Sequence, residues 1–121
     1  MRILMVASEA TPLAKTGGLA DVVGSLPAAL ARLGCDVTLV IPGYREALTS
    51  DASIEPTGIE FDVPLDQRLV RARVLRYRQS KSHVRIMLIE QSDYFDRPTL
   101  YGGQDDYQDN AERFIFFCRA V

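Results

Sequence analysis

The sequence is poor in the side chains that most often build disulfides and catalytic dyads. Its 121 residues include two cysteines, Cys35 and Cys118, and one histidine, His83. Two cysteines are too few for the disulfide framework of a small secreted domain, so we expect a reducing cytosolic setting in which both pack as small hydrophobic residues. No serine or cysteine nucleophile motif lies near His83, so a catalytic dyad is not expected there.

A long apolar run and an excess of positive charge are also missing. No segment approaches the roughly 18 apolar residues of a membrane-spanning helix, and the apolar start at residues 3–7 is too short for a signal peptide. Fourteen Lys and Arg against sixteen Asp and Glu give a formal net charge of −2. Nucleic-acid-binding domains are usually strongly basic. Neither a membrane nor a nucleic acid is therefore an expected partner.

The amino-terminal third has the pattern of a β-strand, an α-helix and a second β-strand. Aliphatic runs at residues 3–7 and 37–41 predict strands that are buried on both faces. Between them, apolar residues recur at helical spacing and Gly34 provides a stop. Pro27 either kinks this helix or lies in the first turn of a segment capped by Ser25. The expected apolar face of the helix consists of Val23, Leu26, Leu30 and Leu33. Such a βαβ unit implies an α/β fold with parallel strands.

The remaining two thirds are less regular. Alternating residues at 61–65 and 70–74 predict strands with one solvated face, and residues 84–89 predict a buried strand. Residues 91–108 have the composition of a loop. Asp109 and Glu112 form a capping-box pattern that opens an apolar helix. No repeat or linker divides the chain.

The most informative segment lies between the first expected strand and the first expected helix. Gly17 and Gly18 lack Cβ atoms, so backbone amides there can approach a ligand closely, and a helix amino terminus attracts anions. Lys15 adds a full positive charge. Ligands of open α/β folds bind at this edge of the sheet. The segment therefore predicts a phosphate or diphosphate site; the alternative is a tight turn beside a solvated lysine.

Two familiar phosphate motifs do not fit this segment. A P-loop has its lysine after the glycines, whereas Lys15 precedes Gly17 and Gly18. The spacing of Gly17, Gly18 and Gly24 also differs from the dinucleotide fingerprint, and the second strand does not end in the acid that binds a ribose. A nicotinamide cofactor is therefore not expected.

At these residues the chain closely resembles bacterial glycogen synthases and plant starch synthases. Residues 15–22, Lys-Thr-Gly-Gly-Leu-Ala-Asp-Val, are similar to the amino-terminal signature of that family, and Ser-Glu-Ala at 8–10 and Gly-Ser-Leu-Pro at 24–27 flank them. Tyr-Phe-Asp-Arg-Pro at 94–98 and Asp-Asn-Ala-Glu-Arg-Phe at 109–114 are also similar. The resemblance spans essentially the whole chain in the same order.

The resemblance implies a GT-B type glycosyltransferase with two Rossmann-like domains and a cleft between them. Such an enzyme transfers glucose from ADP-glucose to the non-reducing end of an α-1,4-glucan acceptor, with retention of configuration and without a metal or other cofactor. Lys15, Gly17 and Gly18 would face the diphosphate of the donor, and Asp21 would point to the sugar and acceptor side. The setting would be the bacterial cytoplasm, or the plastid stroma in a plant.

The resemblance also places the main catalytic groups beyond Val121. We therefore expect residues 1–121 to be an incomplete amino-terminal Rossmann-like domain, without the carboxyl-terminal half and inactive alone. Two other functions stay open at this point. One is a non-catalytic nucleotide-sugar-binding or interaction module, and the other, less favoured, is a Rossmann oxidoreductase domain. The residues do not separate ADP-glucose from UDP-glucose.

Three further groups of residues are candidates for binding. Phe95 could cover the apolar face of a sugar while Asp96 and Arg97 bond its hydroxyls; alternatively, Asp96 and Arg97 pair and brace the loop. Asp105, Asp106 and Asp109 have the oxygen ligands of a cation site, but a solvated loop and a helix cap is the favoured interpretation. The third group is a local basic stretch, which we expect to be partly a solvated strand face: Arg68, Arg71, Arg73, Arg76, Arg78, Lys81 and Arg85.

Overall fold

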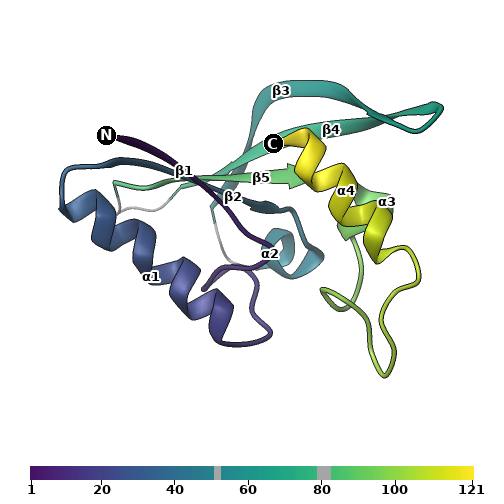
Figure 1. The fold of residues 1–121 in the computed structure, drawn as a ribbon, viewed down its shortest axis with the longest axis horizontal. Coiled ribbons are helices and arrows are strands. Elements are labelled where there is room, and N and C mark those ends of the chain that lie inside the picture. Colours follow the sequence, from purple (N-terminus) through teal and green to yellow (C-terminus); the bar gives the residue numbers. More distant parts are fainter. Residues whose placement is uncertain (51–52, 79–82) are drawn as a thin grey trace.

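A computed structural model of the chain describes residues 1–50, 53–78 and 83–121. Its centre is a five-stranded sheet in the order β1-β2-β5-β4-β3 (Figure 1). The elements in chain order are β1 (Arg2–Val6), α1 (Gly18–Arg32), β2 (Asp36–Pro42), α2 (Arg45–Thr49), β3 (Ile54–Leu65), β4 (Arg68–Tyr77), β5 (Arg85–Glu90), α3 (Ser92–Phe95) and α4 (Asn110–Ala120). Lys81 of the basic stretch lies outside the described residues.

The sheet combines parallel and antiparallel pairing. β1 pairs with β2 and β2 with β5, all parallel, with Ile3 opposite Val37 in the first pair. The hairpin of β3 and β4 joins the free side of β5 in antiparallel order. The predicted βαβ unit and the α/β fold class are confirmed, because α1 connects two parallel neighbours.

Both faces of the sheet carry an apolar core, which follows from the alternation of side chains along β2. Val37, Leu39 and Ile41 are buried in the cluster that contains Val23 of α1. Val40 points the other way, into the cluster that contains buried residues of α4. Two helices therefore cover opposite faces, α1 one and α4 the other.

The expected helix at α1 begins earlier than Ser25. Pro27 lies inside one continuous helix that starts at Gly18, so the interpretation with a cap at Ser25 is wrong. The Ser25 hydroxyl instead donates to the carbonyl of Asp21 at 2.7 Å. At the other end, Gly34 has φ +85°, and hydrogen bonds from its own amide and from Cys35 close a Schellman motif, which confirms the predicted stop.

Leu26 and Leu33 do not belong to the core, contrary to the sequence prediction. Both are exposed, and the residues of α1 that are buried against the sheet are smaller. A narrow strip of Ala20, Val23 and Pro27 lets the helix backbone lie close to the strands. The larger leucines therefore lie on the outer sides of the helix.

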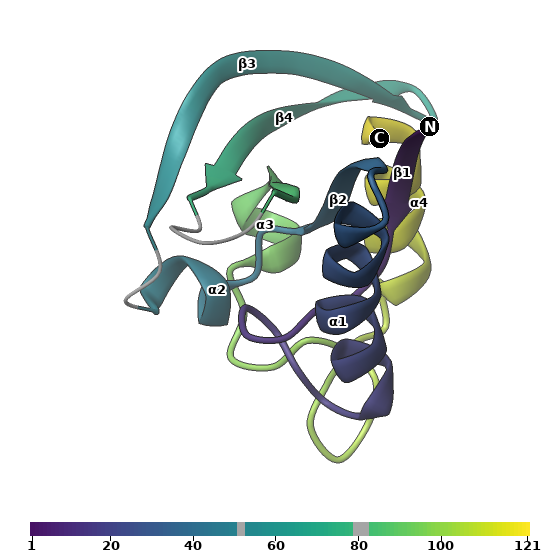
Figure 2. The same ribbon diagram turned by 90° about the vertical axis from the view of Figure 1, so that its left-hand side faces the viewer.

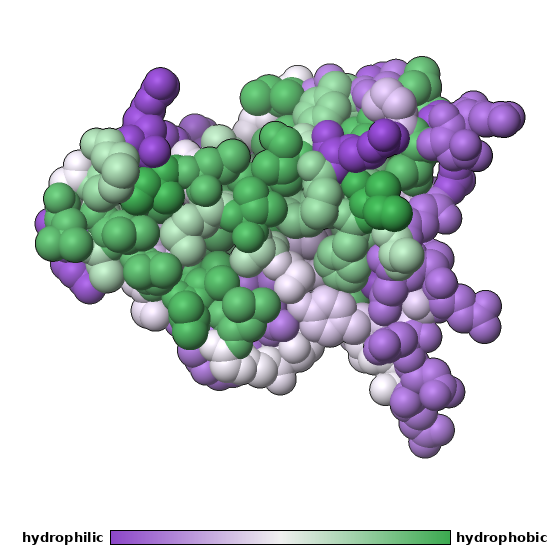
Figure 3. Space-filling model, in the orientation of Figure 1, coloured by the Kyte–Doolittle hydropathy of each residue, from purple (hydrophilic) through white to green (hydrophobic). Residues whose placement is uncertain are grey.

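β1 is not buried on both faces, so this prediction is wrong as well. Leu4 and Val6 are 58% and 46% exposed, whereas Ile3 and Met5 pack against the α1 side of the core. The reason is position, because β1 is the end strand of the described sheet. Figure 3 shows that hydrophobic residues gather across the face formed by α1, β1 and α4.

The α4 helix starts where the sequence predicts, but without the capping box. Asp109 is the residue before the helix, yet its side chain makes no cap hydrogen bond. Its carboxylate binds Arg97 and that of Glu112 binds Tyr94, so tertiary contacts have replaced the local ones. Cys118 is exposed, contrary to expectation, while Cys35 is partly buried.

Candidate functional site

Three connections meet at the carboxyl edge of the parallel strands. They follow β1, β2 and β5 and comprise the turn at residues 7–17, the segment with α2, and α3 with the loop at 96–109. In Figure 2 the turn after β1 and the loop after α3 lie near the amino end of α1, and α2 lies to their left. The glycine turn is therefore at the edge where ligands of parallel α/β sheets bind.

The turn after β1 is held by its own backbone and by two apolar anchors. Leu13 and Ala14 are buried, and the amides of both donate to the carbonyl of Ala10, at 2.9 and 3.0 Å. The Thr11 amide donates to the carbonyl of Ala20 in α1 at 3.0 Å. The Thr11–Pro12 peptide bond is cis. The turn is thus fixed to the first turn of α1, and Lys15 leaves it on the solvent side.

Glu9 lies beneath the turn and was not singled out as a binding candidate. Its side chain is 4% exposed. One carboxylate oxygen accepts the amides of Thr16 at 2.6 Å and Gly17 at 3.3 Å, and the other accepts the Thr16 hydroxyl at 2.8 Å and the Tyr101 hydroxyl at 2.9 Å. Burial raises the pKa of Glu9, but these hydrogen bonds outweigh it and hold the pKa below its ordinary value of 4.5. The carboxylate is therefore ionised at neutral pH.

The backbone amides of the two glycines are not both free to bind a ligand, contrary to the sequence prediction. The Gly17 amide is bound to Glu9 and does not point freely to a ligand. Gly17 is the N-cap residue of α1, in extended conformation, and no side chain caps the helix. A Cβ atom added at Gly17 or at Gly18 would meet no other heavy atom of the described chain within 4 Å. Glycine is a common N-cap, but neither conformation nor crowding within the chain requires a glycine at position 18.

Lys15 and Asp21 are brought together at the mouth of the turn. The Lys15 ammonium is 2.8 and 2.9 Å from the two carboxylate oxygens of Asp21, and the Thr11 hydroxyl donates to the same carboxylate at 3.2 Å. The hydrogen bond from Lys15, and then that from Thr11, lowers the pKa of Asp21. Both charged side chains are more than half exposed, so an anion in solution can reach the lysine.

The candidate sugar site at residues 95–97 is not present in the predicted form. Phe95 is fully buried and packs against other aromatic rings, so its ring offers no face to a sugar. Asp96 binds Arg45 at 2.7 Å, and Arg97 makes two hydrogen bonds to Asp109, at 2.6 and 2.7 Å. The alternative of a direct Asp96–Arg97 pair is therefore not observed either; each residue braces the loop through a distant partner.

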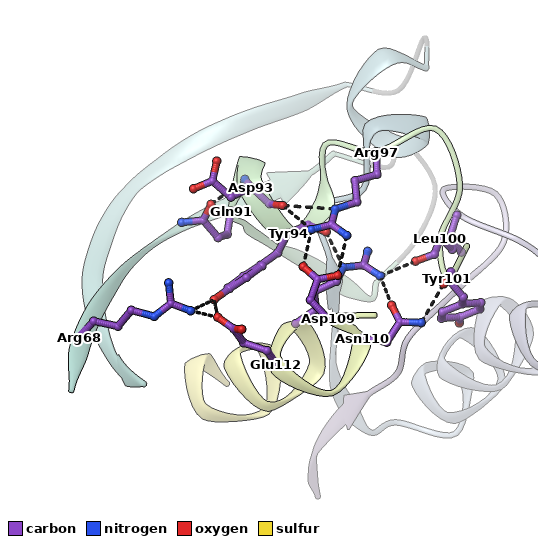
Figure 4. A network of polar contacts seen from close by, with 11 residues as sticks. Arg68, Gln91, Asp93, Tyr94, Arg97, Leu100, Tyr101, Asp109, Asn110 and Glu112 are labelled. Carbon is purple, nitrogen blue, oxygen red and sulfur yellow. Dashed lines mark hydrogen bonds and ion pairs between the residues drawn. The ribbon is translucent and has the colours of Figure 1, made fainter. Parts of the chain in front are cut away.

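A second buried polar residue, Arg113 of α4, holds the loop at 96–109. Figure 4 labels its partners Tyr94, Leu100 and Asn110. Its guanidinium donates to the carbonyls of Tyr94 at 2.6 Å and Leu100 at 3.0 Å, and to the Asn110 side chain at 2.5 Å. Desolvation by burial lowers the pKa of Arg113. The Tyr94 hydroxyl lies in the same network and donates to Glu112 at 2.5 Å. Tyr94, Asn110, Glu112 and Arg113 all lie in the two stretches quoted for the family resemblance, but no sequence signal pointed to a buried network there.

The local basic stretch is largely neutralised in the structure. Arg71, Arg73 and Arg76 lie on β4 opposite acidic residues of β3 and β5. Arg78 follows β4, and Arg85 is the first residue of β5. The ion pairs are Arg68 with Glu112, Arg71 with Glu60 and Asp62, Arg73 with Glu60 and Glu90, Arg76 and Arg78 with Glu55, and Arg85 with Asp36. The described arginines of this stretch therefore do not present a strip of unpaired positive charge.

The remaining candidates can be placed briefly. Asp105 and Asp106 are exposed, whereas Asp109 is bound to Arg97. Over residues 1–50, 53–78 and 83–121, no three His, Cys, Asp or Glu side chains gather in a group that could hold a metal ion. His83 is exposed. In the same part of the chain, no helix is long and apolar enough to span a bilayer.

Comparison with known proteins gives the family. The model of the starch synthase catalytic domain matches residues 2–121. The chain belongs to the glycogen and starch synthase family of glycosyltransferases. Its full length aligns with the glycogen synthase of Rhodopirellula baltica at 44% identity and with that of Syntrophotalea carbinolica at 46% identity. It covers 26% and 25% of those two proteins, so it spans about a quarter of the length of these relatives.

A solved structure agrees with this assignment. The catalytic domain of starch synthase IV from Arabidopsis thaliana, bound to ADP and acarbose, superposes with a TM-score of 0.82 and 28% sequence identity. The match covers 97% of this chain and 23% of that one. The mixed sheet described above is therefore the arrangement of part of a starch synthase catalytic domain. The comparisons identify a transferase family rather than an oxidoreductase one.

Proposed function

We propose that the chain supplies the turn that binds the donor diphosphate in a glycogen or starch synthase. The activity is transfer of glucose from ADP-glucose to the non-reducing end of an α-1,4-glucan, with retention of configuration. The observation that carries the proposal is Gly18, three residues after Lys15, where a Cβ would enter open space at the amino end of α1, which has no side-chain cap. A ligand that approaches the backbone there explains a glycine that the fold itself does not require.

The chemistry of the transfer explains why a cation is useful at this position. When the bond between glucose and the nucleotide breaks, the departing diphosphate gains negative charge, and fixed donors that face it stabilise the transition state. Lys15 supplies a full charge, and the first amides of α1 supply the positive end of the helix dipole. In this proposal Asp21, which binds Lys15 in the free chain, releases it to the diphosphate and then faces the sugar and acceptor side.

We also propose that residues 1–121 alone do not catalyse the transfer. The chain spans about a quarter of the length of the two glycogen synthases named above. The remaining donor contacts and the catalytic groups are expected beyond Val121. ADP bound to the starch synthase IV domain supports ADP-glucose as the donor, and acarbose supports a glucan acceptor. We propose that no metal is required, so that EDTA leaves binding of the donor unchanged. We also propose that the protein works in the bacterial cytoplasm, or in the plastid stroma if it comes from a plant.

The proposal is tested by titrating the chain with ADP and, separately, with inorganic pyrophosphate, while backbone amide signals are followed by NMR. We expect weak binding that shifts the signals of Gly18 and Leu19, and at least tenfold weaker binding for Lys15→Gln. Arg85→Gln is the matched control, because Arg85 is similarly exposed and ion-paired with Asp36 at the opposite edge of the sheet. Equal effects of both variants would refute a diphosphate site at the turn.

A non-catalytic interaction module is the second candidate. It is favoured by the exposed apolar residues of β1 and α1 and by Ile115, which is 52% exposed on α4. Phe116 and Phe117 do not contribute to that surface, because both are buried. Incorporation of glucose from labelled ADP-glucose into glycogen by the 121-residue chain would overturn both this candidate and the proposed inactivity of the chain.

A further inference from the structure

The described part of the chain buries two charged side chains, Glu9 and Arg113. Arg113 is accounted for by the loop that it holds. Glu9 is different, because its carboxylate lies directly beneath the turn of Lys15 and Gly18. A buried charge is costly unless hydrogen bonds compensate it, and the compensating donors of Glu9 come from that turn.

We propose that Glu9 is a positioning residue for the donor diphosphate, an inference that rests on the proposed function. Its carboxylate binds the amides of Thr16 and Gly17 on the inner side of the turn. These two amides are thereby withdrawn from the ligand, and the donors left for the diphosphate are Lys15 and the amides from Gly18 onward. Glu9 thus determines which groups of the turn face outward.

The hydrogen bonds explain why an ionised acid is suited to this position. The carboxylate accepts four donors, namely two backbone amides and the hydroxyls of Thr16 and Tyr101. A carboxylate has acceptor sites for all of them, and hydrogen bonds to a charged acceptor are stronger than neutral ones. A carboxamide of the same shape retains one good acceptor oxygen, so it can hold part of the set. An alanine removes this acceptor from both amides and from the Thr16 hydroxyl, while the Tyr101 hydroxyl keeps only Ser8.

Tyr101 extends the effect of Glu9 to the loop at 96–109. Its hydroxyl lies 2.9 Å from both the Glu9 carboxylate and the Ser8 hydroxyl. Its carbonyl accepts the Asn110 side chain at 2.7 Å and the Tyr107 amide at 2.8 Å. Two connections that are about 90 residues apart in the sequence are therefore joined through one carboxylate. A change at Tyr101 should reach the turn through Glu9.

The experiment measures two properties of the 121-residue chain by NMR. The first is protection of the Thr16 and Gly17 amides from hydrogen exchange, and the second is the dissociation constant of inorganic pyrophosphate. We expect Glu9→Ala to lower the protection of both amides at least tenfold and to raise the dissociation constant at least tenfold. Glu9→Gln and Tyr101→Phe should have intermediate effects. Glu112→Gln is the matched control, because Glu112 also accepts a tyrosine hydroxyl but lies away from the turn. It should leave both properties unchanged.

The outcomes separate this inference from the proposed function. Pyrophosphate binding that is unchanged in Glu9→Gln and Glu9→Ala, while Lys15→Gln loses it, would overturn the inference and leave the proposed function intact. If the unmodified chain binds neither pyrophosphate nor ADP, the proposed function fails for this chain. In that case the role of Glu9 toward the diphosphate fails as well. Lost protection of Thr16 and Gly17 would then show only that Glu9 holds the turn, and unchanged protection would refute even that. Greater loss in Glu112→Gln than in Glu9→Gln also refutes the inference.

Discussion

Lys15 and Asp21 bind each other face to face, with the ammonium within 2.9 Å of both carboxylate oxygens. The two residues are six positions apart, one in the turn and one in the first turn of α1. The lysine proposed to bind the diphosphate therefore has an internal anionic partner in the free chain. A diphosphate has to replace that partner, so the strength of the ion pair sets part of the affinity.

The first prediction concerns this competition. Replacing Asp21 with asparagine removes the competing charge, so we expect several-fold tighter binding of pyrophosphate in an NMR titration. Because both side chains are exposed, the free energy of unfolding in urea should not change measurably. Asp36→Asn, which removes the exposed partner of Arg85, is the control and should not alter binding. Weaker binding in Asp21→Asn would mean that the aspartate itself helps to hold the anion.

The second prediction compares two glycines of the same helix. A Cβ at Gly24 would lie 2.7 Å from the carbonyl oxygen of Thr11, whereas one at Gly18 would meet nothing within 4 Å. Gly24→Ala should therefore lower the free energy of unfolding by about 1–3 kcal/mol. Gly18→Ala should leave it unchanged or raise it by up to about 1 kcal/mol, since alanine favours helix.

For ligand binding we expect the reverse: Gly18→Ala should weaken pyrophosphate binding more than Gly24→Ala does. Gly18→Ala fills the space proposed for the diphosphate, so pyrophosphate should bind at least fivefold more weakly although the fold is as stable as before. Urea unfolding and NMR titration of the same samples separate the two effects. Unchanged pyrophosphate binding in Gly18→Ala would show that the space at Gly18 is not used by the ligand, and the main support for the proposed function would be lost.

The third prediction concerns Arg113. Lysine cannot reproduce the three hydrogen bonds of its buried guanidinium. We therefore expect Arg113→Lys to lower the free energy of unfolding by about 3 kcal/mol. The control is Arg119→Lys on the exposed side of the same helix, where the arginine donates to one carbonyl, that of Pro64. Its effect should be within about 0.5 kcal/mol, and equal effects would contradict the role assigned to Arg113.

The fourth prediction is a pH dependence at the ion pair of Arg97 and Asp109. The hydrogen bonds from Arg97 hold the pKa of Asp109 below its ordinary value of 3.8. A lowered pKa stabilises the fold fully above the ordinary pKa and loses this effect as the pH falls through the lower, folded value. Asp109→Asn should therefore cost about 1 kcal/mol at pH 7 and progressively less below about pH 4.

Urea unfolding of the wild type and Asp109→Asn between pH 2 and pH 7 measures this difference. Asp105→Asn, in the same loop, serves as the control because the Asp105 side chain is exposed. A cost of Asp109→Asn that is constant with pH would show that the asparagine acts through packing rather than through charge.

The sequence was a good guide where local patterns decide the structure. The strands, the stop at Gly34 and the position of the glycine turn follow from aliphatic runs and from glycine conformation, which act over a few residues. The family could be predicted because its motifs are short and contiguous. Details of the turn could not, since the Gly17 amide is bound by Glu9 from the far side of the turn.

The wrong predictions at Phe95, Asp109 and Glu112 have a common physical cause. Phe95, Asp109 and Glu112 have side chains that suit a local role, as a sugar platform or as caps. In the structure Phe95 packs among other rings in the core, and Asp109 and Glu112 bind side chains distant in sequence. Burial of a ring or pairing of charges stabilises the fold more than the expected local contact would. The exposure of Leu4 and Val6 could not be predicted either, because the residues of a strand do not determine whether it lies at the end or in the middle of its sheet.

The outer edge of β1 affects how the chain behaves in concentrated solution. In the strand order described, β1 pairs with β2 on one side, and its other side carries backbone donors and acceptors next to Leu4 and Val6. An apolar edge of this kind is a template for pairing between molecules. Sedimentation should therefore become concentration-dependent, and Leu4→Lys should raise the solubility limit without altering the glycine turn.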